Sequence, residues 1–368
     1  MKPIGLLICC LAVCSISCGG PDNRYPDRWV FEARIPFKTI RYKKGITEWG
    51  IQFSRLDLKL NEKSAWAPVP RQFPTSTLAY TGVLAWDAPP PAAGTNISVI
   101  PYLAGSTAKN VEAGTPTANN FNFGGDAKVA ITSSLNLDLT INPDFSQVEV
   151  DRQVTNLSRF ELFFPERRQF FIENSDLFAQ LGFRGVRPFF SRRIGLNTPI
   201  RFGARLSGRV DKNWRIGVMN VQTDPTHDTG RPAENFAVAA VQRQVFQRSN
   251  ITGFFINKDA LNYDGNGDFS EYDRTAGLEY NLASANNFWT GKIAYHQNMN
   301  AKFDSGTFMH AANIEYDRRD IGFGWQHEIV GENYNPEVGF VPRRDYVRIN
   351  PDFRYRFFPN NMPNLVSH

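Results

Sequence analysis

Cysteine is nearly absent from this sequence of 368 residues. All four cysteines lie within the first 18 residues, and none occurs between Gly19 and His368. From Gly19 onward the chain therefore has no disulfide, no thiol nucleophile and no cysteine-ligated metal. A chain without cysteine also suits passage through an oxidising periplasm in the unfolded state.

Long apolar runs are missing as well. Beyond the N-terminus, none approaches the ~20 residues that a membrane-spanning helix requires. The sequence nevertheless holds 30 Phe, 12 Tyr and 7 Trp, while its mean hydropathy is -0.38. A chain that is rich in aromatic residues but polar on average must alternate the two kinds, as the strands of a β-barrel do.

Recognisable catalytic, metal and nucleic-acid sites are also lacking. The net charge of +5 is mild and the basic residues are scattered, whereas a nucleic-acid-binding protein concentrates them in a stripe. We find no phosphate loop, no nucleophile elbow and no carboxylate pair placed for glycoside hydrolysis. The histidines have no metal-binding spacing: His227, His296, His310, His327 and His368. We therefore expect no cofactor, no metal and no nucleic-acid partner, and we predict a non-enzymatic protein, with a glycoside-hydrolase-type association as the alternative.

The first residues are typical of an export signal. Lys2, an apolar stretch over 4–13 and small residues at Ser15 and Ser17 predict a signal peptide over 1–20. The sequence around Cys18 loosely resembles a lipoprotein cleavage box, which would leave Cys18 acylated. The usual aliphatic residue three places earlier is missing, so ordinary cleavage is the other interpretation.

Two domains follow. Residues 21–88 form a small β-rich region, because 29–37 and 49–55 alternate between apolar and polar residues. Residues 89–95 begin with three prolines and predict a stiff linker. We place the large domain at 96–368.

Period-two alternation repeats throughout the large domain. Leu135, Leu137, Leu139 and Ile141 share one face of a predicted strand, with Asn136, Asp138, Thr140 and Asn142 on the other. Equivalent patterns begin near these positions: 97, 122, 200, 213, 236, 250, 275, 289, 307, 321 and 347. The sequence therefore predicts an all-β fold with an antiparallel sheet of about twelve strands.

Such strands fit a soluble sandwich, whose apolar faces form a core, or a membrane barrel, whose apolar face meets lipid. Many runs have about 9–11 residues, the length of a tilted membrane-spanning strand. Short gaps also alternate with long polar ones, as in outer-membrane barrels. We favour a transmembrane β-barrel in the outer membrane, with lipid as its partner. Arginines on the polar faces are expected to line its lumen: Arg201, Arg205, Arg209, Arg348, Arg354 and Arg356.

Residues 143–190 interrupt the strand pattern. They are dense in aromatic and charged residues, and a connection of this length is usually functional or structured. We expect it to fold into the barrel as a plug or constriction, with Glu166, Arg167, Arg168 and Glu173 against the polar lumen wall. An ordered external loop across the barrel mouth is the alternative.

Three blocks carry a family resemblance: Asn142-Pro-Asp-Phe-Ser-Gln-Val-Glu149, Phe163-Phe-Pro-Glu-Arg-Arg-Gln-Phe-Phe-Ile-Glu-Asn174 and Asn335-Pro-Glu-Val-Gly-Phe340. They resemble the bacterial family known as domain of unknown function 5916, an outer-membrane barrel behind a carbohydrate-binding module of family nine. The resemblance implies that residues 21–88 are a partial β-sandwich of that module. It also implies that Trp49 and Trp66 could stack on sugar rings, although a core or interface role is the simpler interpretation of both.

The chain departs from the family at both ends. Only the closing part of the sugar-binding module is expected, and the C-terminus lacks a final aromatic-ended strand, so we expect a truncated chain, which would leave the barrel open. The predicted function is an outer-membrane barrel for solute passage or for surface handling of glycan-derived material. The alternative is a surface protein, anchored by the barrel, that binds or processes polysaccharide or oligosaccharide.

Overall fold

A computed structural model of the chain describes residues 35, 37, 42, 45–70, 73–91, 97–108, 116–132, 134–143, 151, 154–173, 175–196, 198–226, 230–263 and 270–357. The predicted signal peptide, Cys18 and residues 92–95 of the predicted linker lie outside this range. The chain divides into two compact units, residues 1–96 and 97–368. We describe each unit by itself.

The described residues of the first unit form four short strands in two antiparallel pairs. β1 (Glu48–Ile51) pairs with β4 (Gly82–Ala85), and β2 (Ser54–Asp57) pairs with β3 (Glu62–Ala65); a 3-10 turn, η2, spans Leu78–Tyr80. Trp49 lies among three other rings, with centroids 5.0 Å from Tyr42, 5.2 Å from Trp86 and 6.2 Å from Phe37. This aromatic cluster forms the centre of the unit.

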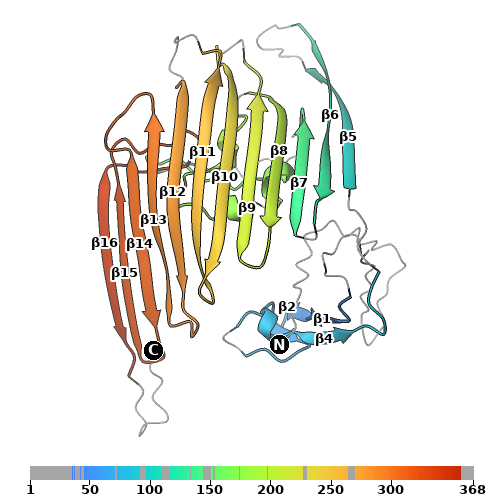
Figure 1. Cartoon of the computed structure of the whole chain (residues 1–368), viewed down its shortest axis with the longest axis vertical. Coiled ribbons are helices and arrows are strands. Elements are labelled where there is room, and N and C mark those ends of the chain that lie inside the picture. Colours follow the sequence, from blue (N-terminus) through green and yellow to red (C-terminus); the bar gives the residue numbers. More distant parts are fainter. Residues whose placement is uncertain are drawn as a thin grey trace. The chain divides into compact units, whose positions relative to one another are not determined.

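The second unit is a single antiparallel sheet of twelve strands in sequence order (Figure 1). Its strands are β5 (Ile97–Ala108), β6 (Ala118–Ala130), β7 (Leu135–Ile141), β8 (Ile200–Arg209), β9 (Trp214–Thr223), β10 (Ala233–Val245), β11 (Ser249–Leu261), β12 (Tyr272–Ala283), β13 (Trp289–Asn300), β14 (Phe308–Asp317), β15 (Ile321–Val330) and β16 (Tyr346–Tyr355). The all-β class and the number of strands are confirmed. β5 and β16 are edges that do not pair with each other, so the sheet is not closed.

Both edges contain a residue that cannot donate a ladder hydrogen bond. Pro101 lies within β5 and Pro351 within β16. Proline is tolerated in a sheet mainly at edge strands, because it lacks the backbone N–H. Each edge strand therefore has one position whose backbone cannot donate a hydrogen bond to another strand.

The connections differ in length at the two ends of the sheet. At one end they are short: 131–134, 210–213, 246–248, 284–288 and 318–320. At the other end they are longer: 109–117, 142–199, 224–232, 262–271, 301–307 and 331–345. This alternation, which the sequence predicts, is the pattern of membrane barrels with short periplasmic turns and long external loops.

One face of the sheet, here called the outer face, exposes apolar side chains. Leu278 is 60% exposed and Phe353 is 71% exposed. Large apolar side chains of this face recur on neighbouring strands: Val99, Leu103, Phe121, Phe123, Leu139, Ile141, Phe202, Val218, Val241, Ile251, Phe255, Ile293, Tyr295, Phe323, Trp325, Val347 and Ile349. The register aligns four aromatic residues of β13–β16 in one row: Trp289, Tyr316, Phe323 and Phe353.

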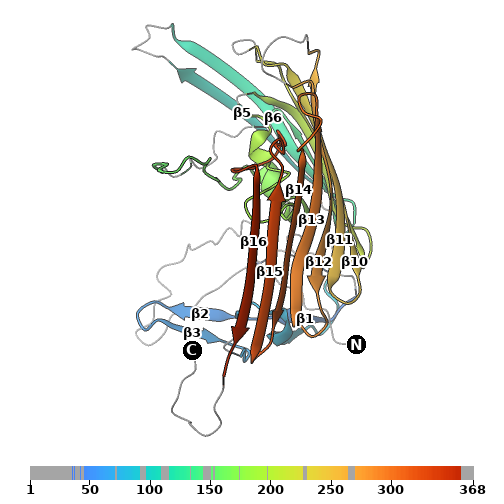
Figure 2. The same ribbon diagram turned by 90° about the vertical axis from the view of Figure 1, so that its left-hand side faces the viewer.

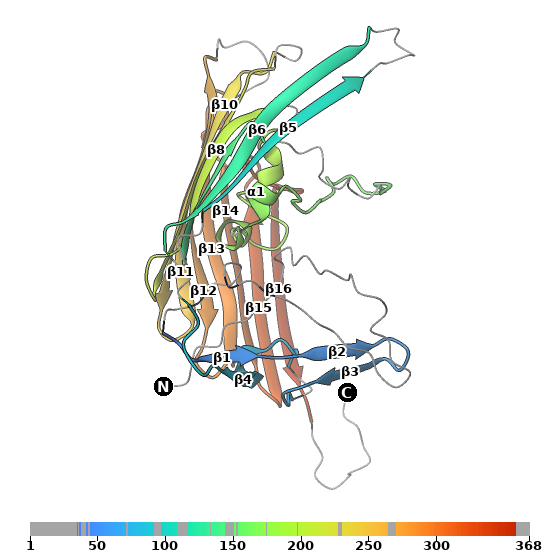
Figure 3. The same ribbon diagram turned by 90° about the vertical axis from the view of Figure 1, so that its right-hand side faces the viewer.

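The opposite face, here called the inner face, buries polar side chains: Asn136, Asp138, Thr140, Arg205, Ser207, Thr252, Lys258, Thr275, Glu279, His296, Gln326 and Glu328. It is the concave side of the curved sheet, as Figures 2 and 3 show. A soluble sheet normally buries its apolar face and exposes the polar one. The burial of the two faces here is the reverse.

Residues 151–196, here called the inner segment, contain no strand in their described part. Short helices α1 (Gln169–Ile172) and α2 (Asp176–Ala179) and a 3-10 turn, η3 (Ser191–Arg193), lie on the concave side (Figure 3). Their apolar residues pack on the middle of β8–β11 in one cluster: Phe171, Leu177, Phe178, Leu181, Phe189, Ile194, Ile200, Met219, Val221, Phe236, Val238, Ala240, Phe254, Ile256 and Val338. The inner face is therefore apolar where this segment covers it and polar around it.

Two local features allow this packing. A Cβ at Gly217 of β9 would lie 2.6 Å from the Phe178 ring, so only glycine leaves room for α2 there. A register shift between Ile200 and Phe202 turns Ile200 inward, where it is 4% exposed. The period-two pattern that begins near position 200 predicts Ile200 and Phe202 on the same face, and this prediction is wrong because of the bulge.

Among the described residues, no helix has the length and apolarity needed to span a membrane.

Candidate lumen-facing site

The inner face of β11–β16 carries a continuous polar row, with one residue from each strand. The register aligns Asn250, Asn281, Lys292, Asn313, Gln326 and Asn350. The Asn281 amide donates to Asn250 at 2.8 Å, and Gln326 donates to Glu328 at 2.8 Å. These side chains supply both donors and acceptors across six neighbouring strands, and Lys292 also donates to the Gln180 carbonyl of the inner segment at 2.8 Å.

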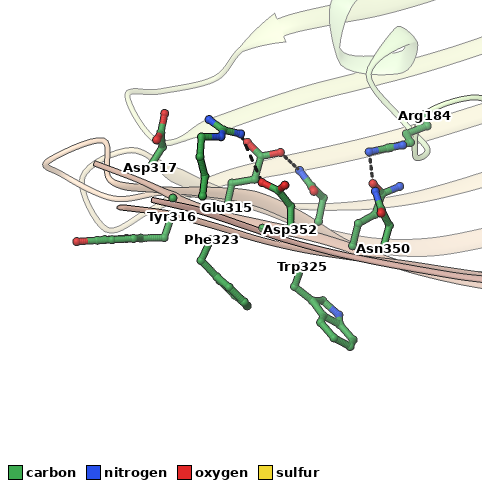
Figure 4. A pocket seen from close by; sticks show the side chains of 13 residues that line it. Arg184, Glu315, Tyr316, Asp317, Phe323, Trp325, Asn350 and Asp352 are labelled. Atoms are coloured by element: carbon green, nitrogen blue, oxygen red, sulfur yellow. Dashed lines mark hydrogen bonds and ion pairs between the residues drawn. The ribbon is translucent and has the colours of Figure 1, made fainter. Parts of the chain in front are cut away.

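A groove of about 190 Å³ lies on this row, between β14, β15 and β16. Figure 4 shows Glu315 and Asp352 on one side of the sheet, with Arg184 of the inner segment reaching toward the same side. Phe323 and Trp325 point to the opposite side (Figure 4). The charged side chains of these strands thus face the groove on the inner side, and the aromatic side chains face the apolar outer side.

Arg205 connects the inner segment to the sheet. It is 1% exposed, its Nη2 lies 2.7 Å from Asp138 on β7, and it donates to the backbone carbonyl of Phe170 in α1. A buried guanidinium needs both a carboxylate and further acceptors to offset its desolvation. Arg205 has both, and one of them belongs to the inner segment.

Glu166 and Arg168 hold the inner segment together. Their side chains pair at 2.8 Å, the Ser191 hydroxyl donates to Glu166 at 2.6 Å, and Arg168 donates to the Ile194 carbonyl at 2.8 Å. Burial alone raises the pKa of Glu166, but hydrogen bonds and charge from Arg168 and the Ser191 hydroxyl outweigh it, so the pKa lies below its usual value.

The other two charged residues predicted in this segment differ in their partners. Glu173 forms an ion pair with Lys128 of β6, and so contacts the strand wall directly. Arg167 lies 3.4 Å from Asp151, within the segment. A hydrogen bond from Arg192 is the main reason that the pKa of Asp151 is lowered.

The strand arginines predicted to line the lumen fall into two groups. Arg205 is buried, as described above. The others are more exposed and lie near carboxylates: Arg201 with Asp224 at 3.8 Å, Arg348 with Glu328 at 3.8 Å, Arg354 with Asp352 at 3.4 Å and Arg356 with Asp317 at 3.5 Å. Arg209 is exposed at the end of β8. The structure thus brings Arg348 and Arg354 to one side of β16, and places Arg201 and Arg209 at opposite ends of β8.

A buried network beneath the loops was not apparent from the sequence. His296 of β13 lies 3.0 Å from Glu279 and 3.1 Å from the Tyr334 hydroxyl. Lys292 pairs with Glu279 at 2.7 Å, and the Gly182 amide of the inner segment donates to Glu279 at 2.6 Å. His296 and Tyr334 are both 0% exposed, and burial raises the pKa of Tyr334 well above its usual value. The network therefore fixes the inner segment and the 331–345 loop to the wall.

Only the register reveals these partners. Glu279 and His296 are separated by 17 residues in sequence, and no motif spacing marks them. The alternating pattern does place Glu279 on the polar face of its strand, which is the one signal available.

The two tryptophans of the first unit have different environments. Trp49 is 6% exposed in the aromatic cluster, which is a core position. Trp66 is 59% exposed, and its ring lies edge-on to Phe53 at 5.8 Å. Of the two, Trp66 is the one with a ring surface open to a ligand.

No group of three or more His, Cys, Asp or Glu side chains in the described part of the chain could hold a metal ion.

Comparison with known families gives one match. Residues 93–205 match the family model described as Domain of unknown function (DUF5916). This confirms the family resemblance over the linker end, β5–β7 and the inner segment up to β8. Searches of curated proteins and of solved structures found no match to the chain.

Proposed function

We propose that strands β5–β16 form the wall of an outer-membrane β-barrel through which a solute passes. The outer face contacts lipid, and the inner face lines a water-filled lumen that the inner segment narrows as a plug. The predicted role in the surface handling of glycan-derived material is part of this proposal.

The distribution of side chains between the two faces carries the proposal. Exposed large apolar side chains recur on the outer face of eleven of the twelve strands, a surface far larger than the few hundred Å² that soluble monomers usually expose. In a bilayer the same surface is favourable, and the buried polar face then meets an aqueous interior. The strands of 10–13 residues, apart from the 7 of β7, are also long enough to cross when tilted.

Membrane fractionation of the full chain tests this proposal. We expect recovery with the outer membrane, release only by detergent, and faster migration of the unheated protein on a denaturing gel. Recovery as a soluble species that needs no detergent contradicts it.

The plug role is supported by contacts of the inner segment with the wall at Arg205, Glu279 and Lys128. Deletion of residues 146–175 should raise single-channel conductance in planar bilayers. Unchanged conductance of the inserted deletion variant would exclude the plug and favour an external loop.

A second candidate function is sugar binding by the first unit, and the exposure of Trp66 favours it. The Trp66→Ala variant of the full chain should then lose retention on a glycan array, while Trp86→Phe, a change in the aromatic cluster, should retain it. If neither Trp66→Ala nor Trp86→Phe retains any sugar, this candidate function is contradicted.

A further inference from the structure

A second cavity, of about 420 Å³, lies between the inner segment, the β15–β16 connection and β16. Its volume is within the range of about 300–1,000 Å³ that is common for small-molecule sites. Two kinds of side chain predominate in its lining. They are the rings of Phe160, Phe163, Phe340 and Tyr346, and the guanidinium groups of Arg184, Arg343 and Arg348.

Positive charge exceeds negative charge in this cavity. Two carboxylates lie in the lining, Glu161 and Glu328. Glu161 is neutralised by Arg193, whose Nη2 lies 2.6 Å away. Glu328 alone therefore faces the three guanidinium groups of the lining.

Glu328 does not saturate those groups. It already accepts hydrogen bonds from Gln326 and from the Tyr346 hydroxyl, each at 2.8 Å. Arg184 and Arg348 lie 3.7 Å and 3.8 Å from it, beyond the about 2.7–2.9 Å of a charge-assisted hydrogen bond. Because each guanidinium has five N–H donors, both arginines keep donors for a second anion.

Arg184 is also held in an unusual backbone conformation. Its φ is 50°, in the left-handed region that favours glycine or asparagine. It lies in a tight turn closed by two hydrogen bonds of 2.9 Å between Phe183 and Val186. An arginine at this position is locally unfavourable, which is consistent with a role for its side chain.

The aromatic rings provide an apolar surface beside these charges. Phe163 is 40% exposed and packs against Phe340 at 5.3 Å, and Arg343 lies 5.0 Å over the ring of Tyr346. Aromatic surface with nearby guanidinium groups can contact a ring and an acidic group of one ligand at the same time.

We infer that this cavity binds an organic anion that combines a ring with acidic groups, with Arg343 and Arg348 binding the acidic groups and the phenylalanine rings contacting the ring. The inference rests on the proposed function, because the cavity opens on the inner face and its ligand is then the solute of the lumen.

Calorimetry on the full chain, folded in detergent micelles, tests this site with three probes. Benzene-1,3-dicarboxylate has a ring and two charges, its diamide has the ring alone, and malonate has the charges alone. We expect the dicarboxylate to bind at least tenfold more tightly than either of the others. Arg343→Gln and Arg348→Gln should each weaken its binding at least tenfold. Arg318→Gln, the same charge change in the β14–β15 turn, should leave the affinity within twofold.

Equal binding of the dicarboxylate and the diamide, no binding of the dicarboxylate, or equal effects of the Arg343 and Arg318 substitutions overturns the inference. Heat-modifiable migration of each variant shows whether it is folded, and a variant that is not folded is replaced by the corresponding Met substitution, which also removes the charge. Binding without membrane insertion contradicts the proposed function but not the cavity. Membrane insertion without binding of the dicarboxylate contradicts only the inference that the cavity binds an organic anion.

Discussion

Among the described residues of the sheet, the large apolar side chains of the outer face are far more exposed than the polar side chains of the inner face. Phe353 of β16 is 71% exposed and Leu278 of β12 is 60% exposed, whereas Arg205 and Glu279 on the inner side are 1% and 2% exposed. The same strands carry both sets at alternate positions. Since burying a charge is costly and exposing a large apolar group to water is unfavourable, both faces are costly in water. The outer face becomes favourable if it meets lipid, and the inner face is tolerated because its charges are paired.

The difference also shows how the inner face tolerates charge. The buried charges of this face have partners of opposite sign, some from the segments that cover it: Arg184 of the inner segment lies near Glu328, and Lys258 pairs with Glu234 and with Glu337 of the 331–345 loop. Polar packing on this side is therefore specific, whereas packing on the outer side requires only an apolar surrounding.

The largest expected effect comes from breaking a buried pair on the inner face. Arg205→Ala leaves the Asp138 carboxylate buried without its partner and removes a donor to Phe170, so we expect a loss of about 3–5 kcal/mol. Urea unfolding of the protein in detergent micelles measures it. The double variant Arg205→Met with Asp138→Leu removes both charges and should recover most of the loss. A single variant as stable as the parent contradicts the anchoring role of Arg205.

A charge placed on the outer face should have the next largest effect. Leu278 lies in the middle of β12, so Leu278→Arg should destabilise the inserted protein by about 2–4 kcal/mol. An exposed site in water tolerates such a change within about 0.5 kcal/mol. Asn350→Arg, on the inner face beside Asp352, should have little effect. If the two variants unfold at equal midpoints in lipid vesicles, the claim that the outer face contacts lipid and the inner face does not is contradicted.

The contact between the inner segment and the wall can be tested by size alone. Gly217→Val places a side chain against Phe178 and should cost about 1–3 kcal/mol by overpacking, with a rise in single-channel conductance as α2 is displaced. Gly253 lies on the outer face of β11, where a Cβ meets only Leu278 at 4.0 Å. Gly253→Val should therefore leave conductance unchanged. Equal conductance of both variants argues against a plug.

A smaller effect is expected at Glu166, and it depends on pH. Because the pKa of Glu166 is lowered in the folded state, its contribution is present above the unfolded pKa of about 4.3 and is lost as the pH falls through the folded value. Glu166→Gln should cost about 1 kcal/mol near neutral pH. The difference in unfolding free energy from the parent should shrink below about pH 4 and vanish at lower pH. A difference that stays constant over this range contradicts the role of the ion pair.

Sequence alternation was sufficient to predict the twelve strands, their short and long connections and the polar side of most of them. It could not predict where that polarity is interrupted. Phe236 and Val238 face inward on β10 because the inner segment covers them, and this contact joins residues far apart in sequence. Nor could it predict the partners of His296, which depend on the register of β12 and β13 and on a loop 38 residues away. The inward position of Ile200 could not be predicted either. The bulge adds one residue to β8 and so turns Ile200 to the inner face, although the alternation of residue types continues unchanged.

The most direct measurement compares two neighbouring positions of β16. Because no cysteine follows Cys18, spin labels can be attached singly to Phe353→Cys and Asp352→Cys in a chain that is produced without residues 1–18 and inserted into vesicles. The account predicts that the label at 353 collides mainly with oxygen, which concentrates in lipid, and the label at 352 mainly with a water-soluble nickel complex. Equal access of the nickel complex to both labels would contradict it.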